Sequence, residues 1–278
     1  MNVSFLYPIS MTAKKEIMDN IRNKWIIFLS IIFALLTLVA SYFGSIGRTG
    51  WQDIDMTIEA MMSLVQLLIP IIALMLGYAA IIGEIQKGSM SALLAQPVTR
   101  IEIVLGKFIG LGSVLAFTIL IGFGIAGIII AINVADVNFV HYTIFMISTI
   151  IIGLVFLSMA LFFSTVFKKR STAMGSAIFL WFFFNMILPL ITMGLLVAAL
   201  TYEDILNNSI PSWFHIANLL NPLSTYTIFN QLSLGISGTI PNIPYPNYYN
   251  PALMMIILLI WIITFLLLSC WRFKKREI

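Results

Sequence analysis

The sequence is poor in charged residues and nearly free of cysteine. Only 9% of its 278 residues are Asp, Glu, Lys or Arg, whereas 60% are hydrophobic. An average soluble domain has about a quarter of its residues charged. The composition therefore excludes an ordinary soluble domain and predicts an integral membrane protein. The single cysteine, Cys270, excludes an internal disulfide and a cysteine-based metal cage.

Motifs for chemistry are also missing. The Gly106-Lys107 pair is followed by Phe108 and lacks the preceding glycine of a phosphate-binding loop, so we do not expect the chain to bind ATP itself. No HExxH, GxSxG or paired acidic motif occurs in an apolar run, and we expect no catalytic site, metal or cofactor. No charge lies deep in an apolar run, which argues against a proton-coupled carrier. Because the sequence shows no polar lining of a cavity deep in the spans, we expect an apolar or amphipathic substrate, or one held at the interface of a dimer.

Long apolar runs make up most of the chain. Each is long enough to cross about 30 Å of hydrocarbon as an α-helix, and their continuous hydrophobicity favours helices over barrel strands. We predict an all-α polytopic membrane protein in which residues 1–278 form one transmembrane domain. The six predicted spans are 25–46, 60–82, 105–132, 143–167, 173–200 and 252–271.

The basic residues predict the orientation of these spans. Every Lys and Arg except Arg48 falls on one side of the membrane if both termini are cytoplasmic. Because Lys and Arg concentrate in cytoplasmic segments, this is the predicted topology. Topology also explains the formal net charge of +4, so nucleic-acid binding is not expected.

Residues 1–24, before the first span, combine apolar and basic side chains. The apolar ones recur at four-residue spacing at Ile9, Ala13, Ile17 and Ile21. This spacing is typical of an interfacial helix whose apolar face lies in the lipid boundary. A charged flank of the first span is the alternative. The residues expected to meet the membrane surface are Lys14, Lys15, Arg22 and Lys24.

Residues 83–107 form a polar, charged stretch between the second and third apolar runs, predicted to face the cytoplasm and contact a partner. It contains a short amphipathic helix candidate at 89–96, closed by Pro97, because a proline disfavours helical geometry in the residue before it. Within the neighbouring runs, Gly106 and Gly110 have the GxxxG spacing that permits close helix packing. Pro70 predicts a kink whose freed carbonyl is satisfied by a neighbour.

Residues 201–251 form a long segment on the predicted outer side. Its middle, 213–234, is amphipathic and predicts one or two short helices that lie on the outer leaflet or dip into it. Its end is rich in proline, asparagine and tyrosine and is not expected to be helical.

The residues of 83–107 are specific as a set: Gly83-Glu84, Gly88-Ser89, Leu93-Leu94, Pro97, Arg100 and Gly106-Lys107. With the basic N-terminus and six spans, this set resembles the permease subunits of type-two ABC exporters. Their connection reads Glu, Gly-Thr, leucines, Pro, Arg and Gly-Lys, and Ser89 stands here in place of Thr. Within that family the chain is similar to the permeases of nitrous oxide reductase maturation systems, through residues 21–25, the 83–107 stretch and Asn221-Pro222.

The resemblance implies a coupling helix near 89–96 that docks on a separate cytoplasmic ATPase. Glu84 would fix the start of the loop, Pro97 would end the helix, and Arg100 and Lys107 would meet ATPase acids or lipid phosphates. The alternatives are a local Glu84–Lys87 pair and plain anchoring by the basic residues. The expected ATPase-coupling residues are Glu84, Gly88, Ser89, Leu93, Leu94, Pro97, Arg100 and Lys107.

The resemblance also implies the partners. A second permease copy, as a homodimer, and two ATPase copies that bind ATP and Mg would form an exporter in a prokaryotic cell membrane. The alternatives are a non-transporting membrane assembly or immunity factor that docks a cytoplasmic partner, and an ATP-independent carrier or channel.

Overall fold

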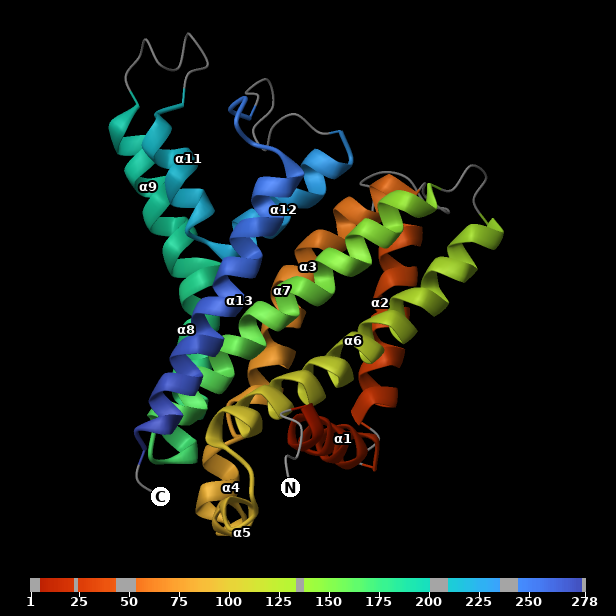
Figure 1. Ribbon diagram of the computed structural model, residues 1–278. Helices are drawn as coiled ribbons and strands as arrows, with labels where there is room; N and C mark the ends of the chain where they lie inside the picture. Colours follow the sequence, from red (N-terminus) through yellow and green to blue (C-terminus); the bar gives the residue numbers. More distant parts are fainter. Residues whose placement is uncertain are drawn as a thin grey trace.

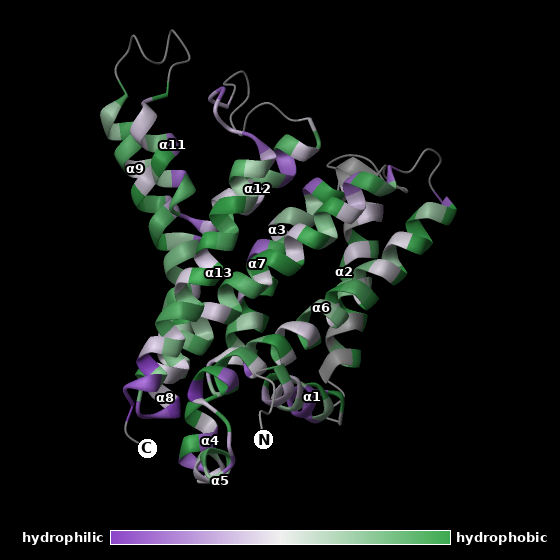
Figure 2. Ribbon diagram, in the orientation of Figure 1, coloured by the Kyte–Doolittle hydropathy of each residue, from purple (hydrophilic) through white to green (hydrophobic). Residues whose placement is uncertain are grey.

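The computed structural model describes residues 6–22, 25–43, 54–133, 138–200, 210–235 and 245–276. Within these ranges every regular element is helical, as the sequence predicted. Long helices run obliquely side by side, with hydrophobic residues along their middles and hydrophilic ones towards the ends (Figure 1, Figure 2). Helix α1 (Leu6–Arg22) and the last turn of α13 (Pro251–Lys274) lie at the same end, here named the basal end. The opposite end is the distal end.

Five helical segments of the described chain are long and apolar enough to cross a membrane. They match the second to sixth predicted runs. The first predicted run is α2 (Trp25–Phe43), a 19-residue helix that packs against α6, and its role as a span remains a prediction. The five segments are Thr57–Gln86, Arg100–Asn133, Phe139–Val166, Arg170–Ala199 and Pro251–Lys274.

Two of these segments are interrupted. The first consists of α3 (Ile54–Gly77), a turn, and the short α4 (Ile82–Gln86), followed by α5 (Ser89–Leu94). The fourth consists of α8 (Arg170–Phe182), a π-helical turn η1 (Phe183–Ile187) and α9 (Leu188–Ala199). The other segments are α6 (Arg100–Asn133), α7 (Phe139–Val166) and α13. Helix α7 is the centre of the bundle, because α3, α12 and α13 pack against it and 67% of its apolar window is buried.

Helix α1 lies across the basal part of α6, where glycines let the two backbones approach closely (Figure 1). A Cβ on Gly106 would lie 2.6 Å from Thr12 Cβ, and a Cβ on Gly110 would lie 2.8 Å from the backbone oxygen of Ala13. The predicted GxxxG contact is therefore made by α1. We expected Ile9 and Ala13 to face lipid, but both are buried at this contact. Ile21, by contrast, is 53% exposed.

The 213–234 region forms two short helices, α11 (Ser212–Leu219) and α12 (Pro222–Ser233). The turn between them is packed inside the bundle, because the buried Asn221 donates from Nδ2 to the Phe184 carbonyl of η1 at 3.0 Å. Asn221 Oδ1 also accepts from the Leu223 backbone N–H at 3.0 Å and caps α12. The pair is thus a hairpin that dips in from the distal end. Residues 201–209 and 236–244 lie outside the described chain.

The kink residue Pro70 lies inside α3 and leaves the Gln66 carbonyl without its helical donor. Asn185 of η1 takes this place. With its amide oxygen facing the Trp181 indole N–H at 3.2 Å, its nitrogen donates to the Gln66 carbonyl at 3.2 Å. The predicted neighbour that satisfies the freed carbonyl is therefore the π-helical turn.

The contact between α1 and α6 predicts a position-specific cost of added volume. Gly110→Ala forces its Cβ against the α1 backbone, and we expect a loss of about 1–3 kcal/mol in unfolding free energy. Gly124→Ala, on the same helix with open space at its Cβ, should be neutral or slightly stabilising. Reversible denaturation in detergent micelles measures both, and equal effects would contradict the packing.

Candidate functional site

Four charged residues meet where α1, α4 and α6 converge, and we name Lys15, Glu16, Glu84 and Lys107 the basal ion cluster. Lys107 Nζ lies 2.6 Å from Glu16 Oε1 and 3.0 Å from Glu84 Oε2. Lys15 Nζ lies 2.9 Å from the other carboxylate oxygen of Glu84. Lys107 is only 1% exposed, so its charge depends on these two carboxylates for compensation. The cluster therefore fixes three helices at one point.

This geometry corrects one expectation and contradicts one of the alternatives. Lys107 does not point outward to a partner or a lipid phosphate. Helix α6 begins at Arg100, so Lys107 lies two turns inside it on the side covered by α1. Glu84 pairs with Lys107 and Lys15, and Lys87 is not its partner. Burial lowers the pKa of Lys15, but its hydrogen bond with Glu84 and the surrounding carboxylates outweigh this and raise it, so Lys15 is charged at neutral pH.

Helix α5 projects from the basal end next to α4, the helix that carries Glu84 of this cluster (Figure 1). Gly88 has a φ of 76° at the turn from α4 to α5, a conformation that glycine adopts without strain. Ser89 Oγ donates to the Glu84 carbonyl at 3.3 Å and closes α4. The helix ends at Leu94 instead of Gln96, and Pro97 follows it.

One side of α5 is anchored and the other is open. Met90 is fully buried in a small apolar cluster with Ile81, Ile103, Val104 and Phe273, which links α5 to α6 and α13. Leu93 and Leu94 are half-buried at the edge of the same cluster, so they support α5 more than they project from it. The exposed residues of this part of the chain are Gln86, Lys87, Gly88, Ser89, Ser91, Ala92, Ala95, Gln96 and Pro97.

The start of α6 is tied to the end of α13 through Arg100. Its guanidinium donates to the Phe273 carbonyl at 2.9 Å and to the Arg276 carbonyl, and lies 5.5 Å from the centre of the Phe273 ring. A cation at the carbonyl end of a helix is favourable. We expected Arg100 to reach outward to a partner or a lipid phosphate, but it is engaged within the chain.

Two further contacts at the basal end were not recognised in the sequence. Thr99 and Glu102 form a capping box, with Glu102 Oε2 accepting from the Thr99 backbone N–H at 2.6 Å and from its hydroxyl at 2.7 Å. The Thr-x-x-Glu spacing is a readable signal for this. Ser164 Oγ of α7 accepts from the Ile81 and Ile82 N–H groups at 3.0 and 3.1 Å, which caps α4 across the bundle. No sequence pattern indicates that contact.

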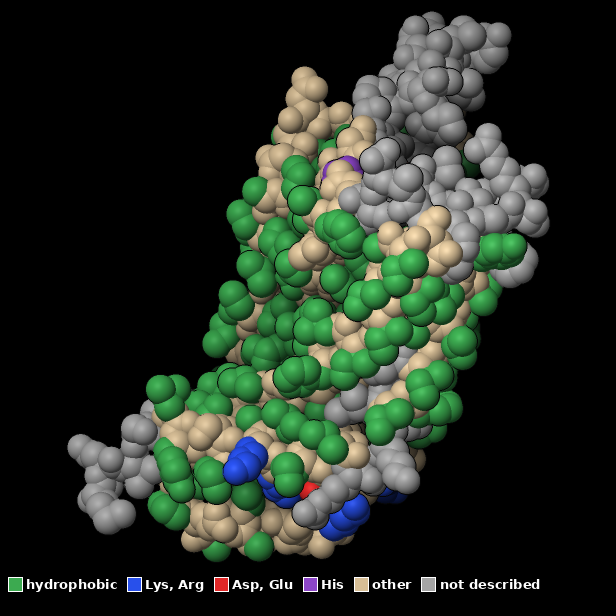
Figure 3. Space-filling model, turned by 90° about the vertical axis from the view of Figure 1, so that its right-hand side faces the viewer, with side chains coloured by type: hydrophobic (Ala, Val, Ile, Leu, Met, Phe, Trp, Pro, Cys, Tyr) green, Lys and Arg blue, Asp and Glu red, His purple; other side chains and the backbone are tan. Residues whose placement is uncertain are grey.

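The side chains expected at the membrane surface are only partly described. Lys14 is exposed on α1, while Lys15 is drawn into the basal ion cluster. Lys24 and the Arg22 side chain lie outside the described residues. On the face seen in Figure 3, hydrophobic side chains cover the middle and the visible Lys and Arg gather at the basal end.

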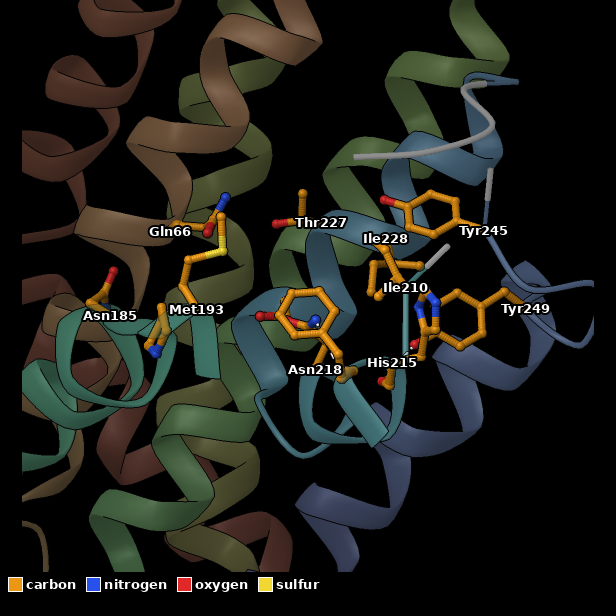
Figure 4. A pocket seen from close by; sticks show the side chains of 13 residues that line it. Gln66, Asn185, Met193, Ile210, His215, Asn218, Thr227, Ile228, Tyr245 and Tyr249 are labelled. Carbon is orange, nitrogen blue, oxygen red and sulfur yellow. Dashed lines mark hydrogen bonds between the residues drawn. The ribbon is translucent and has the colours of Figure 1, made fainter. Parts of the chain in front are cut away.

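A second feature lies in the distal half, where a cavity of about 390 Å³ opens between α3, η1, α9 and the α11–α12 hairpin (Figure 4). We name it the distal cavity. Polar side chains lie among its mostly apolar walls, although no such lining could be recognised in the sequence. The cavity could not be recognised in the sequence, because its lining residues are far apart along the chain. Of these residues, Gln66 and Asn185 are the ones that stand out as polar within predicted spans. It is lined by Gln66, Asn185, Pro189, Met193, Ile210, Phe214, His215, Asn218, Ser224, Thr227, Ile228, Tyr245 and Tyr249.

The fold and the basal end define a polytopic helical membrane protein with a short, firmly mounted helix presented outside the bundle. Residues 11–278 match the family model described as "ABC-2 family transporter protein", and the chain belongs to this family of ABC transporter permeases. It is 35% identical over 277 residues to the "Probable ABC transporter permease protein NosY" of Stutzerimonas stutzeri, covering 95% of this chain and 97% of the relative. It is 32% identical over 274 residues to the protein of the same description from Pseudomonas aeruginosa, covering 96% and 98%.

The basal ion cluster predicts a large effect of removing its central cation. Lys107→Met leaves the partly buried Glu16 without its cation and Glu84 with Lys15 alone, and we expect a loss of about 3–5 kcal/mol in unfolding free energy. Adding Glu16→Gln and Glu84→Gln to this variant removes those charges and should recover part of the loss. Lys14→Met, at an exposed position of α1, should change the free energy by less than about 0.5 kcal/mol. Similar effects of the two lysine substitutions would contradict the assignment.

Proposed function

We propose that this permease couples ATP hydrolysis by a separate ATPase subunit to export across the membrane, and that the exposed side of α5 is where the ATPase docks. The observation that carries the proposal is the mounting of α5. It is open to a partner on one side and held by the buried Met90 on the other.

The contacts around α5 give a route for movement into the spans. Met90 joins it to α6 and α13, and the basal ion cluster joins α4 to α1 and α6. A displacement of α5 by a closing ATPase would therefore act on several helices together. This differs from a flexible loop, which would absorb the movement. The residues expected to touch the ATPase shift accordingly from Arg100 and Lys107 to the exposed residues of α5.

The partners follow from what this chain carries. Its sequence lacks a phosphate-binding loop, so ATP and Mg belong to the ATPase, with two copies serving a homodimer of the permease. The Arg170–Ala199 segment has only 11% of its apolar window buried, and a second copy would cover part of it. We place the basal end in the cytoplasm of a prokaryotic cell, supported by the basic residues gathered there (Figure 3).

Site-directed cross-linking tests the docking surface. In a Cys270→Ser background, Ala92→Cys should cross-link to the ATPase in membranes that contain both subunits, because Ala92 lies on the open side of α5. Phe139→Cys, 59% exposed at the distal start of α7, is the matched control and should not cross-link. Capture of no nucleotide hydrolase from Ala92 would overturn the proposal.

Coupling is tested separately. Ala92→Arg adds a large charged side chain to the docking surface without disturbing the packed side of α5. We expect at least a tenfold loss of vanadate-sensitive ATP hydrolysis and of export in the reconstituted complex, with insertion and unfolding free energy unchanged. An assembly factor that only docks a partner would show the cross-link without any coupled transport. An ATP-independent carrier would transport without the partner.

A further inference from the structure

We propose that the distal cavity is a binding site for one small, uncharged, polar molecule, held by hydrogen bonds to Gln66, Asn218 and Ser224. The assignment of this molecule as the transported substrate rests on the proposed function. The existence of the site and its selectivity do not depend on that function.

The first support is the set of polar groups left open in the cavity. The Gln66 side-chain amide, the Ser224 hydroxyl and the His215 imidazole make no hydrogen bond to any residue that the structure describes. Asn218 uses only its amide nitrogen, which donates to the Phe214 carbonyl at 3.1 Å, so its side-chain oxygen remains available. These residues are half-buried, so their open groups are accessible to a ligand that offers hydrogen-bond donors and acceptors.

The second support is the absence of charge in the described lining. No Asp, Glu, Lys or Arg is among those residues. The histidine does not supply a charge either, because burial lowers the pKa of His215 and leaves its ring neutral at neutral pH. Among the described lining residues, an ion that gave up its hydration would meet no opposite charge, which is strongly unfavourable. The described part of the lining therefore selects against both anions and cations.

The third support is size and shape. A volume of about 390 Å³ lies near the lower end of the range for ligand pockets, about 300–1,000 Å³, and suits one small molecule. Pro189, Met193 and Ile228 add apolar walls beside the polar groups. A lipid chain would fit the apolar walls but would leave the open amide and hydroxyl groups unpaired.

The placement of the open groups matches a site reached from the distal end. In Figure 4, Gln66, Asn185 and Met193 lie on one side of the cavity and His215, Tyr245 and Tyr249 on the other, with Asn218 and Thr227 between them. Gln66 and Asn185 belong to the middle of their membrane-crossing segments. Tyr249 fixes the hairpin side, because its hydroxyl donates to the His215 carbonyl at 2.7 Å. The cavity thus spans from mid-depth towards the distal surface.

Thiol modification tests the charge selection without any knowledge of the ligand. Ser224→Cys, in a Cys270→Ser background, places a thiol of nearly the same size in the cavity wall. The probes are three methanethiosulfonates that carry a neutral hydroxyethyl, a cationic trimethylammonium-ethyl or an anionic sulfonatoethyl group. Rates at Ser224→Cys are divided by those at Phe139→Cys, exposed at the distal end, to remove intrinsic reactivity. We expect the normalised rate of the neutral reagent to exceed that of either charged reagent at least tenfold.

A second substitution checks that Gln66 faces the same cavity as Ser224. Gln66→Glu keeps the side-chain shape and adds a negative charge, so the normalised rate of the cationic reagent should rise at least tenfold and that of the anionic reagent should fall. The rates at Phe139→Cys serve as the control for folding and should not change.

Equal normalised rates for the three reagents would show an open surface and would overturn the proposal. No reaction with any of them would show a closed, unreachable space and would overturn it as well. A normalised preference for an apolar benzyl methanethiosulfonate over the hydroxyethyl reagent would indicate a lipid site instead. Because these rates require neither ATPase nor transport, a failure of the proposed function leaves them unchanged.

Discussion

The burial of one ammonium group sets the arrangement of the basal end. Lys107 is 1% exposed, and an isolated charge in such a place would cost several kcal/mol. Glu16 and Glu84, from different helices, provide its compensation at 2.6 and 3.0 Å. Removal of either carboxylate would leave the buried ammonium of Lys107 with only one negatively charged partner. The glycines at positions 106 and 110 make this possible, because they bring α1 close enough to α6 for Glu16 to reach the ammonium.

This constraint explains how the two ends of the molecule can work together. Helix α6 is 34 residues long and carries Lys107 near its basal end, while α3 and α4 bring Glu84 to the same point from the segment that also carries Gln66. Helix α5, which a partner would displace, and α3, which lines the distal cavity, are thus parts of one chain segment, joined through a short turn and α4. That turn is capped by Ser164 of α7, so it is supported from the centre of the bundle.

The sequence predicted features that depend on local composition. Continuous apolar runs marked the five segments that the structure shows as long apolar helices, Pro97 marked the end of the projecting helix, and the 213–234 pattern marked two short helices. It misjudged features that depend on neighbours distant in the chain. Lys107 looked like an outward-facing base because only the three-dimensional contact with α1 shows which side of α6 is covered. The distal cavity was hidden for the same reason, since its polar groups come from separate helices. The Thr99–Glu102 cap was readable and was overlooked.

The π-helical turn at Phe183–Ile187 amounts to one extra residue in the helical phase of its span. A π-helical turn closes i→i+5 hydrogen bonds, so it takes up this residue while α8 and α9 keep nearly the same relative rotation. Pro189 and Met193 therefore face the distal cavity in spite of the extra residue. Loss of a single residue there would turn η1 into regular α-helix and would move or remove Asn185, which holds the Gln66 carbonyl freed by Pro70. Length variation at this one position would therefore disturb the kink of α3 while leaving the hydrophobic profile of the span intact.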